Sequence, residues 1–262
     1  MRDILKKMSK KEEREGTIHP TKQGCLLKII TYHNSQNCDV QFLDEYGYTV
    51  QNREYKEIIK GTIKNPYHPS VYGVGYGGEG RHRITIDNRR IKMSRKWSGA
   101  LERSYCPKYH KRFPTYIGCS IDKHWANFQN FGDWFEANYK PEYMEGWCLD
   151  KDILFKGNKI YSPETCCFVP SEINNLLTNR KNHRGEYPLG VRPSKNGKKF
   201  VAYCCKEGKW THIKSCNTIE EAFEAHKIAK EGEIKRLANK WRGQITEPWY
   251  QALMNWTVNI TD

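Results

Sequence analysis

Short runs of apolar and aromatic residues predict strands in the first third of the chain. Residues 26–33, 38–51 and 70–80 form such runs, and Asn, Gly and Pro separate them. β-branched and aromatic residues are typical of strands, and the separating residues favour turns. We therefore expect a small, strongly bent β-domain over residues 23–80. Residues 1–16 alternate charge without an apolar face and are interpreted as a frayed helix or tail, so residues 1–22 form a charged tail before this domain.

A helical period follows in the middle of the chain. Residues 90–139 contain aromatic residues at spacings of three or four, which places them on one helix face, where packing is the usual role. They are Trp125, Phe128, Phe131, Trp134 and Phe135. The pattern predicts a helical region, and residues 147–180 form a separate compact unit after it.

The last third again predicts strands, followed by one helix. Residues 187–216 are rich in Gly and Lys, and a helix is predicted to begin at Thr218, because Glu221 three positions later completes a capping box. We expect an α+β protein made of small modules in series. Beyond the tail and the β-domain, the predicted modules are residues 81–182, residues 185–245 and a C-terminal extension of residues 246–262.

Charge changes this picture, because the 262-residue chain carries a formal charge of +14 in two clusters. Eleven Lys or Arg lie between Arg81 and Arg112 and ten between Thr178 and Lys214, each block against only two acids. Residues 133–152, between the blocks, hold six carboxylates against two lysines. Clustered cations interleaved with Tyr, Trp and Asn favour a nucleic-acid partner, and the alternative is solvated basic faces.

The N-terminus lacks the apolar core of a signal peptide, and no apolar run reaches membrane-spanning length. We therefore expect a cytoplasmic protein with no membrane partner. Its ten cysteines are expected to be reduced thiols.

Residues 147–179 carry the most specific motif. Two extended runs flank the turn Lys156–Asn158, and a helix beginning at Pro170 or Ser171 then carries two asparagines, which gives a ββα order. Together with the segment YSPETC at residues 161–166, this sequence resembles the HNH homing-endonuclease family of phages and mobile introns. The resemblance covers roughly residues 94–180.

The resemblance implies a DNA endonuclease, encoded by a phage and acting in the bacterial cytoplasm. By analogy, Asp150 and Asn174, or Asn175 in a helix register shifted by one, hold one Mg²⁺ or Mn²⁺ through oxygen, and the cation stabilises the leaving oxygen. Many family members have His after the aspartate, where this chain has Lys151. A protonated lysine cannot accept a proton from water, so the base stays open. The other candidates are Asp152, His124, His110 and His183.

A second metal hypothesis concerns two cysteines and two histidines. Cys106, His110, Cys119 and His124 have the spacing C-x3-H-x8-C-x4-H, which would suit a structural Zn²⁺ site. The alternative, which we favour, is that the cysteines are simply buried.

The C-terminal module resembles the plant ethylene-response-factor, or APETALA-type, DNA-binding domain. The resemblance rests on residues 190–192, 197–202, 208–209 and 218–226, and it implies a three-stranded sheet in the major groove of double-stranded DNA. By analogy, the DNA contacts are Arg192, Lys195, Lys198, Lys199, Lys209, Trp210 and His212. The face of the sheet that points outward is not fixed by the sequence, and a solvated basic sheet is the alternative. Because most of these cations are lysines, we expect them to position phosphates more than to read bases.

The leading hypothesis is a DNA endonuclease in which the β-domain and the C-terminal domain anchor DNA on either side of a metal-dependent ββα centre. The second is a DNA-binding protein with a degenerate HNH centre, a regulator or an inhibitor of a host defence system, and it rests on Lys151. An RNA-binding module is the third hypothesis.

Overall fold

The computed structural model describes residues 8–178 and 186–262, and the chain divides into two compact units, Met1–Phe135 and Glu136–Asp262. Small sheets and helices alternate along both units, so the predicted α+β class is confirmed. Across the part of the chain that is described, no helix has both the length and the apolar character needed to cross a membrane.

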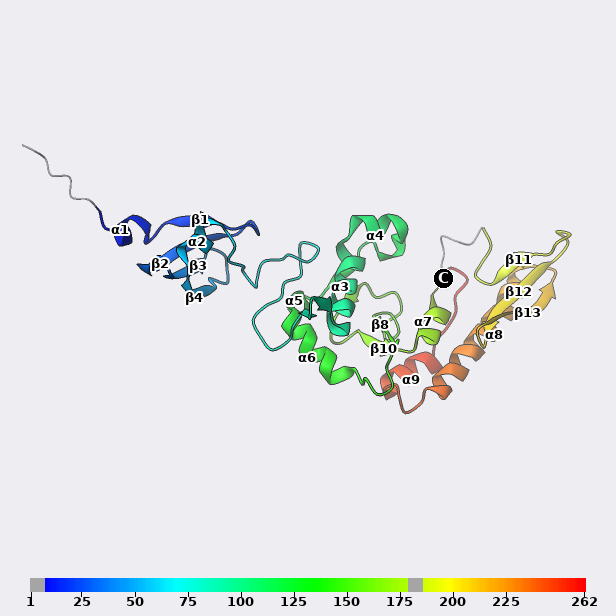
Figure 1. Cartoon of the computed structure of the whole chain (residues 1–262). Helices are drawn as coiled ribbons and strands as arrows, with labels where there is room; N and C mark the ends of the chain where they lie inside the picture. Colours follow the sequence, from blue (N-terminus) through cyan, green and yellow to red (C-terminus); the bar gives the residue numbers. More distant parts are fainter. Residues whose placement is uncertain (1–7, 179–185) are drawn as a thin grey trace, which may run out of the picture. The chain divides into compact units, whose positions relative to one another are not determined.

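The first unit begins with a four-stranded antiparallel sheet in the order β1-β2-β3-β4 (Figure 1). Its elements are α1 (Lys10–Arg14), β1 (Ile18–Pro20), β2 (Leu26–Asn34), β3 (Asn37–Phe42), β4 (Thr49–Arg53) and α2 (Tyr55–Ile59). Alternate residues of β2 and β3 are buried, as a half-buried strand requires, and Ile58 of α2 packs among them. Strand β1 lies within residues 1–22, so the sheet begins earlier than the predicted boundary at residue 23.

The rest of this unit is mainly helical. Its elements are β5 (Thr85–Ile86), β6 (Arg89–Arg90), α3 (Lys92–Tyr105), α4 (Pro107–Arg112), the 3-10 turn η1 (Pro114–Tyr116), β7 (Ser120–Ile121), α5 (Lys123–Ala126) and α6 (Phe128–Asn138). The aromatic stripe does pack inward, since Trp125, Phe128 and Phe131 are almost fully buried. The helix carrying it is interrupted at Asn127, whose extended backbone forms a bridge to Tyr76.

The second unit starts with the ββα segment. Its elements are β8 (Cys148–Asp150), β9 (Ile160–Tyr161), β10 (Cys167–Val169) and α7 (Ser171–Leu177). The ββα order is present, but the predicted hairpin around residues 156–158 is wrong, because β8 pairs with β10 and places Asp150 opposite Cys167. Gly157 does form a turn, with φ +81°, yet polar contacts hold residues 151–160 as a loop. The fully buried run of β10 supplies the partner strand instead.

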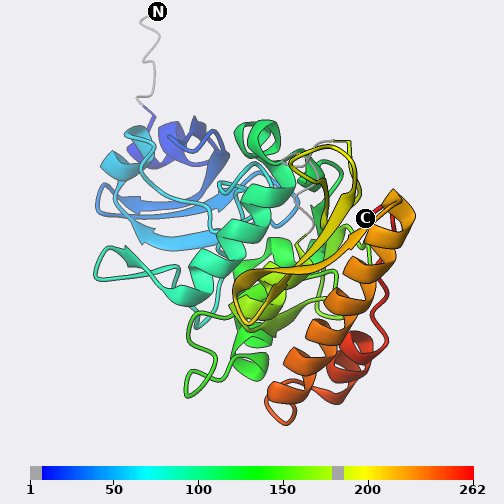
Figure 2. The same ribbon diagram turned by 90° about the vertical axis from the view of Figure 1, so that its right-hand side faces the viewer.

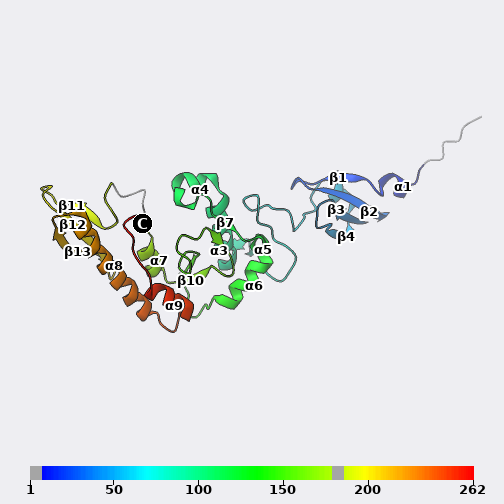
Figure 3. The ribbon, with the colours of Figure 1, turned by 180° about the vertical axis from the view of Figure 1, so that it is seen from behind.

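The C-terminal part is the predicted three-stranded sheet packed on one helix (Figures 1 and 3). Its elements are β11 (Val191–Pro193), β12 (Phe200–Lys206), β13 (Lys209–Cys216), α8 (Ile219–Lys240) and α9 (Glu247–Met254). The capping box is confirmed, because the Glu221 N–H donates to Thr218 Oγ1 over 3.1 Å and the Thr218 N–H donates to Glu221 Oε2 over 3.4 Å. Figure 2 shows α8, in orange, along its length with α9, in red, beside its C-terminal part.

The core of this domain requires a glycine at position 190. Gly190 has φ +74°, and a Cβ atom there would lie 1.9 Å from Nδ1 of His226. The same imidazole nitrogen is 2.6 Å from the Tyr203 carbonyl oxygen, so β11, β12 and α8 meet at this point.

Candidate metal centre and nucleic-acid interface

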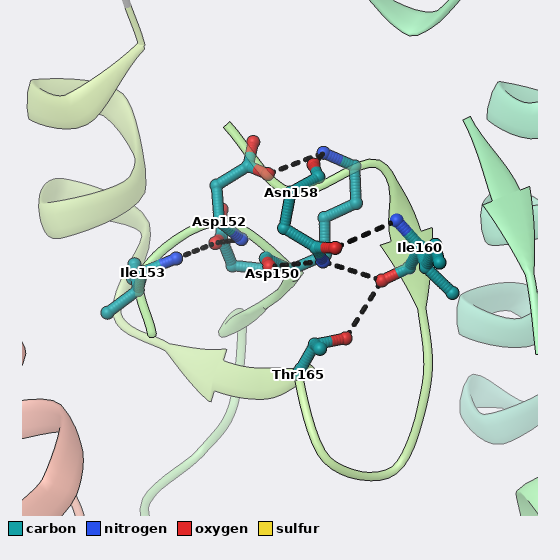
Figure 4. A network of polar contacts seen from close by, with 7 residues as sticks. Asp150, Asp152, Ile153, Asn158, Ile160 and Thr165 are labelled. Carbon is teal, nitrogen blue, oxygen red and sulfur yellow. Dashed lines mark hydrogen bonds and ion pairs between the residues drawn. The ribbon is translucent and has the colours of Figure 1, made fainter. Parts of the chain in front are cut away.

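Asp150 ends β8 with its carboxylate turned back onto the chain that follows (Figure 4). Its Oδ1 accepts hydrogen bonds from the N–H groups of Asp152, at 2.7 Å, and Ile153, at 3.1 Å. An aspartate favours this local turn because its short side chain reaches the N–H two residues ahead. Within the described residues Oδ2 makes no hydrogen bond, so one oxygen of the carboxylate stays available.

Burial raises the pKa of the Asp150 carboxyl above its ordinary value, even though the two N–H donors lower it. The negative charge of Asp152 raises this pKa further, and the positive charge of Lys151 lowers it. A desolvated carboxylate with a spare oxygen is stabilised in its ionised form by a bound cation.

Lys151 is a structural cation in this arrangement. Its side chain is only 7% exposed, and Nζ lies 2.6 Å from Asp152 Oδ1. The same ammonium donates to the Asn158 carbonyl oxygen over 2.5 Å, and the Asn158 amide donates in return to the Lys151 carbonyl oxygen over 2.9 Å. Lys151 therefore fastens the loop of residues 151–158 and makes no ion pair with Asp150 within the described residues.

The two asparagines of α7 differ in exposure. Asn174 is half-buried and Asn175 is exposed, since successive residues of a helix point about 100° apart. Within the described ranges, neither side-chain amide makes a hydrogen bond, and none joins either residue to Asp150. The start of α7 is tied to the region before β8 through Ser171, whose hydroxyl donates to the Gly146 carbonyl oxygen over 2.6 Å.

Asp150 and Asn174 have the donor types that a hard divalent cation takes, but no contact within the described residues joins the two side chains. Asp150 offers an unbonded carboxylate oxygen and Asn174 an uncommitted amide oxygen, both on the ββα unit. Mg²⁺ and Mn²⁺ accept such oxygen ligands, and Mg²⁺ usually keeps several waters beside one or two carboxylates and a substrate phosphate. In residues 8–178 and 186–262, no three His, Cys, Asp or Glu side chains are grouped closely enough to hold a metal.

The four residues of the zinc hypothesis are not brought together by the part of the chain that is described. Cys119 is buried, whereas the His124 side chain is 69% exposed and lies 3.1 Å from Asp122. His110 Nε2 is 2.8 Å from the Arg103 carbonyl oxygen, and Cys106 is a free, half-buried thiol.

The candidate bases lie in different parts of the chain and have different partners. His110 and His124 belong to the first unit, with the contacts just given. Asp152 lies in the second unit with its carboxylate paired to Lys151. His183 lies outside the described residues.

The C-terminal sheet has one face on α8 and one face in solvent. Val191, Ala202 and Cys204 are buried toward the helix. Because paired residues of an antiparallel sheet share a face, the outer face carries the pairs Arg192 and Val201, Tyr203 and His212, and Cys205 and Trp210. On this face Val201 is buried and Tyr203 and Cys205 are half-buried, whereas Arg192, Trp210 and His212 are exposed. The structure thus assigns the face that the sequence left open.

All seven predicted DNA contacts are exposed. They are Arg192, Lys195, Lys198, Lys199, Lys209, Trp210 and His212. The guanidinium of Arg192 lies 5.6 Å from the ring centres of both Tyr203 and Trp210, so an aromatic and cationic patch occupies the middle of the sheet.

The lysines lie at the ends of this patch. Three occupy the loop between β11 and β12, which is closed by the hydrogen bond from the Ser194 N–H to the Lys199 carbonyl oxygen. Lys209 follows the β12–β13 turn, where Glu207 and Gly208 both have positive φ. Tyr203, which is half-buried, is not among the seven predicted contacts, although its pairing with His212 places it on the outer face of the sheet.

A contact that the sequence did not reveal fastens α7 to the end of α8. The Glu172 carboxylate accepts from Lys240 Nζ over 2.6 Å and from Trp241 Nε1 over 2.5 Å. Burial alone would raise the pKa of Glu172, but these two donors outweigh it and the pKa is lowered. The Trp241 ring also meets Trp147 edge-on, with ring centres 5.5 Å apart. Glu172, the second residue of α7, therefore holds α7 against the end of α8, the helix that packs on the sheet.

Compared with models of known protein families, with curated proteins and with solved structures, the chain matches none. Its function is accordingly inferred from the chemistry of these two sites.

Proposed function

We propose that the protein is a metal-dependent, HNH-like endonuclease that hydrolyses phosphodiester bonds of double-stranded DNA. We place this activity in the cytoplasm of a phage-infected bacterium, as the sequence resemblance implies. The observation that carries the proposal is the half-buried Asp150 carboxylate, with one oxygen unbonded within the described residues, in a ββα unit joined through Glu172 to the helix behind an exposed cationic sheet.

The residues divide the work between binding and chemistry. The outer face of the sheet binds the duplex, with lysines at phosphates and the Arg192, Tyr203 and Trp210 patch against the groove. Asp150 and Asn174 would hold Mg²⁺ or Mn²⁺, which when bound supplies Lewis-acid stabilisation of charge on the scissile phosphate and the leaving oxygen.

Lys151 supports this centre indirectly. Its ammonium neutralises Asp152 and ties the loop at Asn158, so the turn that orients Asp150 is held in place. An ammonium that already donates to a carboxylate and a carbonyl does not serve as the acceptor of water's proton.

One observation favours a second candidate, a catalytically inactive DNA-binding protein that acts as a regulator or as an inhibitor of a host defence system. Lys151 occupies the position where the HNH family often has its base, and it is committed to the ion pair with Asp152. In that case the ββα unit would be a scaffold for the sheet.

Supercoiled plasmid separates the two candidates. The full chain is incubated with plasmid and Mg²⁺ or Mn²⁺, beside Asp150→Asn and the matched control Glu224→Gln, an exposed acid on α8 changed to its amide. The endonuclease proposal expects open circles with the wild type and the control, and intact plasmid with bound protein for Asp150→Asn. Binding without nicking by the wild type would support the inactive scaffold, and nicking by Asp150→Asn would reject the assigned centre.

A further inference from the structure

A two-stranded ribbon, β5 and β6, stands exposed in the first unit. Thr85 pairs with Arg90 and Ile86 with Arg89, and the two residues between them, Asp87 and Asn88, have φ of 49° and 58°. Two consecutive positive φ values are typical of the type I′ turn, which suits a tight hairpin. Every residue from 85 to 90 is exposed, and Ile86 retains 52% of its surface.

The base of this ribbon is anchored. The Ile91 N–H donates to the Ile84 carbonyl oxygen over 3.4 Å, and α3 begins directly afterwards. Arg90 Nη1 donates to Ser98 Oγ on α3 over 3.2 Å, and Trp97 of the same helix is fully buried. An isolated two-stranded ribbon is marginal in water, so its attachment to a packed helix supports it.

The charge on and around the ribbon is one-sided. Residues 81–96 contain seven Lys or Arg and a single acid, Asp87. Three of the arginines, Arg83, Arg89 and Arg95, are exposed and, within the described residues, make no side-chain hydrogen bond or ion pair. Exposed guanidiniums gathered without acidic partners create a positive potential that is suited to a polyanion.

We propose that the β5–β6 ribbon is a second DNA-binding element, which lies in a groove of the duplex with its arginines on the flanking phosphates. A two-stranded ribbon has the width that a DNA groove admits, and exposed apolar residues such as Ile86 contact base or sugar edges in such complexes. The element is distinct from the C-terminal sheet, and the inference shares with the proposed function only the premise that the chain binds DNA.

The test compares two full-length double variants that lose the same charge. Arg83→Gln/Arg89→Gln alters the ribbon and its base, and Lys123→Gln/Lys235→Gln alters exposed lysines on α5 and α8, outside the proposed DNA-binding elements, as the control. Binding to a fluorescent blunt duplex is measured by anisotropy over a range of salt concentrations. Each lost phosphate contact lowers the slope of log K against log salt by about 0.9, so the ribbon variant should lose about 1.8 in slope and about 60-fold in affinity at 0.1 M salt.

Further measurements show which claim fails. Equal slopes and affinities for the ribbon variant, the control and the wild type would overturn the ribbon assignment while leaving the proposed nuclease intact. An equal loss of binding to heparin and to duplex would also overturn it, because the surface would then be a general polyanion site. Wild-type protein that binds duplex through the ribbon but never nicks plasmid would reject only the nuclease. Circular dichroism of both variants confirms that they are folded.

Discussion

Asp150→Asn separates the structural role of Asp150 from its proposed metal-binding role. The amide keeps an oxygen that can accept from the N–H groups of Asp152 and Ile153, which lie 2.7 and 3.1 Å from the present carboxylate oxygen. It removes the negative charge that burial disfavours. Asp150→Ala, in contrast, removes the acceptor itself and leaves both N–H groups unpaired.

The two substitutions are expected to change the free energy of unfolding in different directions. Because burial raises the folded-state pKa of Asp150, ionisation costs stability as pH rises from its ordinary value of 3.8 through the folded-state pKa. Each unit of that rise corresponds to about 1.4 kcal/mol at pH above both values. Asp150→Asn should therefore be at least as stable as the wild type at pH 7 without metal. Asp150→Ala should lose about 1 to 3 kcal/mol with its two hydrogen bonds.

Thermal unfolding with and without Mn²⁺ measures both effects. A cation at one hundred times its Kd adds about 2.7 kcal/mol to the folded state, which should raise the wild-type Tm by about 10 °C. Neither variant should show that rise. A Tm that increases equally with Mn²⁺ in wild type and Asp150→Asn would place the metal elsewhere, and an Asp150→Asn protein as unstable as Asp150→Ala would contradict the assigned role of burial.

Three further variants test the supports of the two sites. Lys151→Met should lower the free energy of unfolding in urea by about 1 to 3 kcal/mol, because the Asp152 carboxylate and the Asn158 carbonyl lose their buried donor; an unchanged midpoint would contradict a structural role. Gly190→Ala should cost about 2 kcal/mol or more through its clash with His226, whereas Gly208→Ala, also at positive φ but with open space around it, should cost less in the same titration. Glu172→Gln should flatten the acid limb of the Tm profile, because the lowered pKa stabilises the wild type above about pH 4.5 and that stability is lost as pH falls; identical profiles from pH 7 to 3 would refute this.

The elements with local signals were predictable from the sequence. Three local signals follow from short-range rules: the β-branched and aromatic residues of β2 and β3, the aromatic spacing around Phe128 and Phe131, and the capping box at Thr218. The structure contains the elements that all three predict. Such signals depend on residues within a few positions of one another.

The pairing of β8 was not predictable in the same way. The turn at Gly157 satisfied the local rule for a hairpin, but the buried run at residues 167–169 competed for β8 and supplied its partner strand. The contacts of Lys151 were not predictable from local sequence either, because its acceptor on Asn158 is seven residues away in a loop without a regular period. The sequence shows that a lysine is present at position 151, but only the fold shows that it is paired with Asp152.

The long helix α8 connects the two proposed sites of the second unit. Its 22 residues extend about 33 Å at 1.5 Å per residue. The N-terminal part of α8 carries Phe223 and His226, which pack against the sheet, and Lys240 and Trp241 at its end hold Glu172 on α7. Because a helix resists stretching, a duplex seated on the sheet would meet the ββα unit at a fixed distance along its axis. The proposed enzyme would then cut at a set offset from the site that the sheet occupies, and weakening the Glu172 contact would spread the cut positions while leaving that site unchanged.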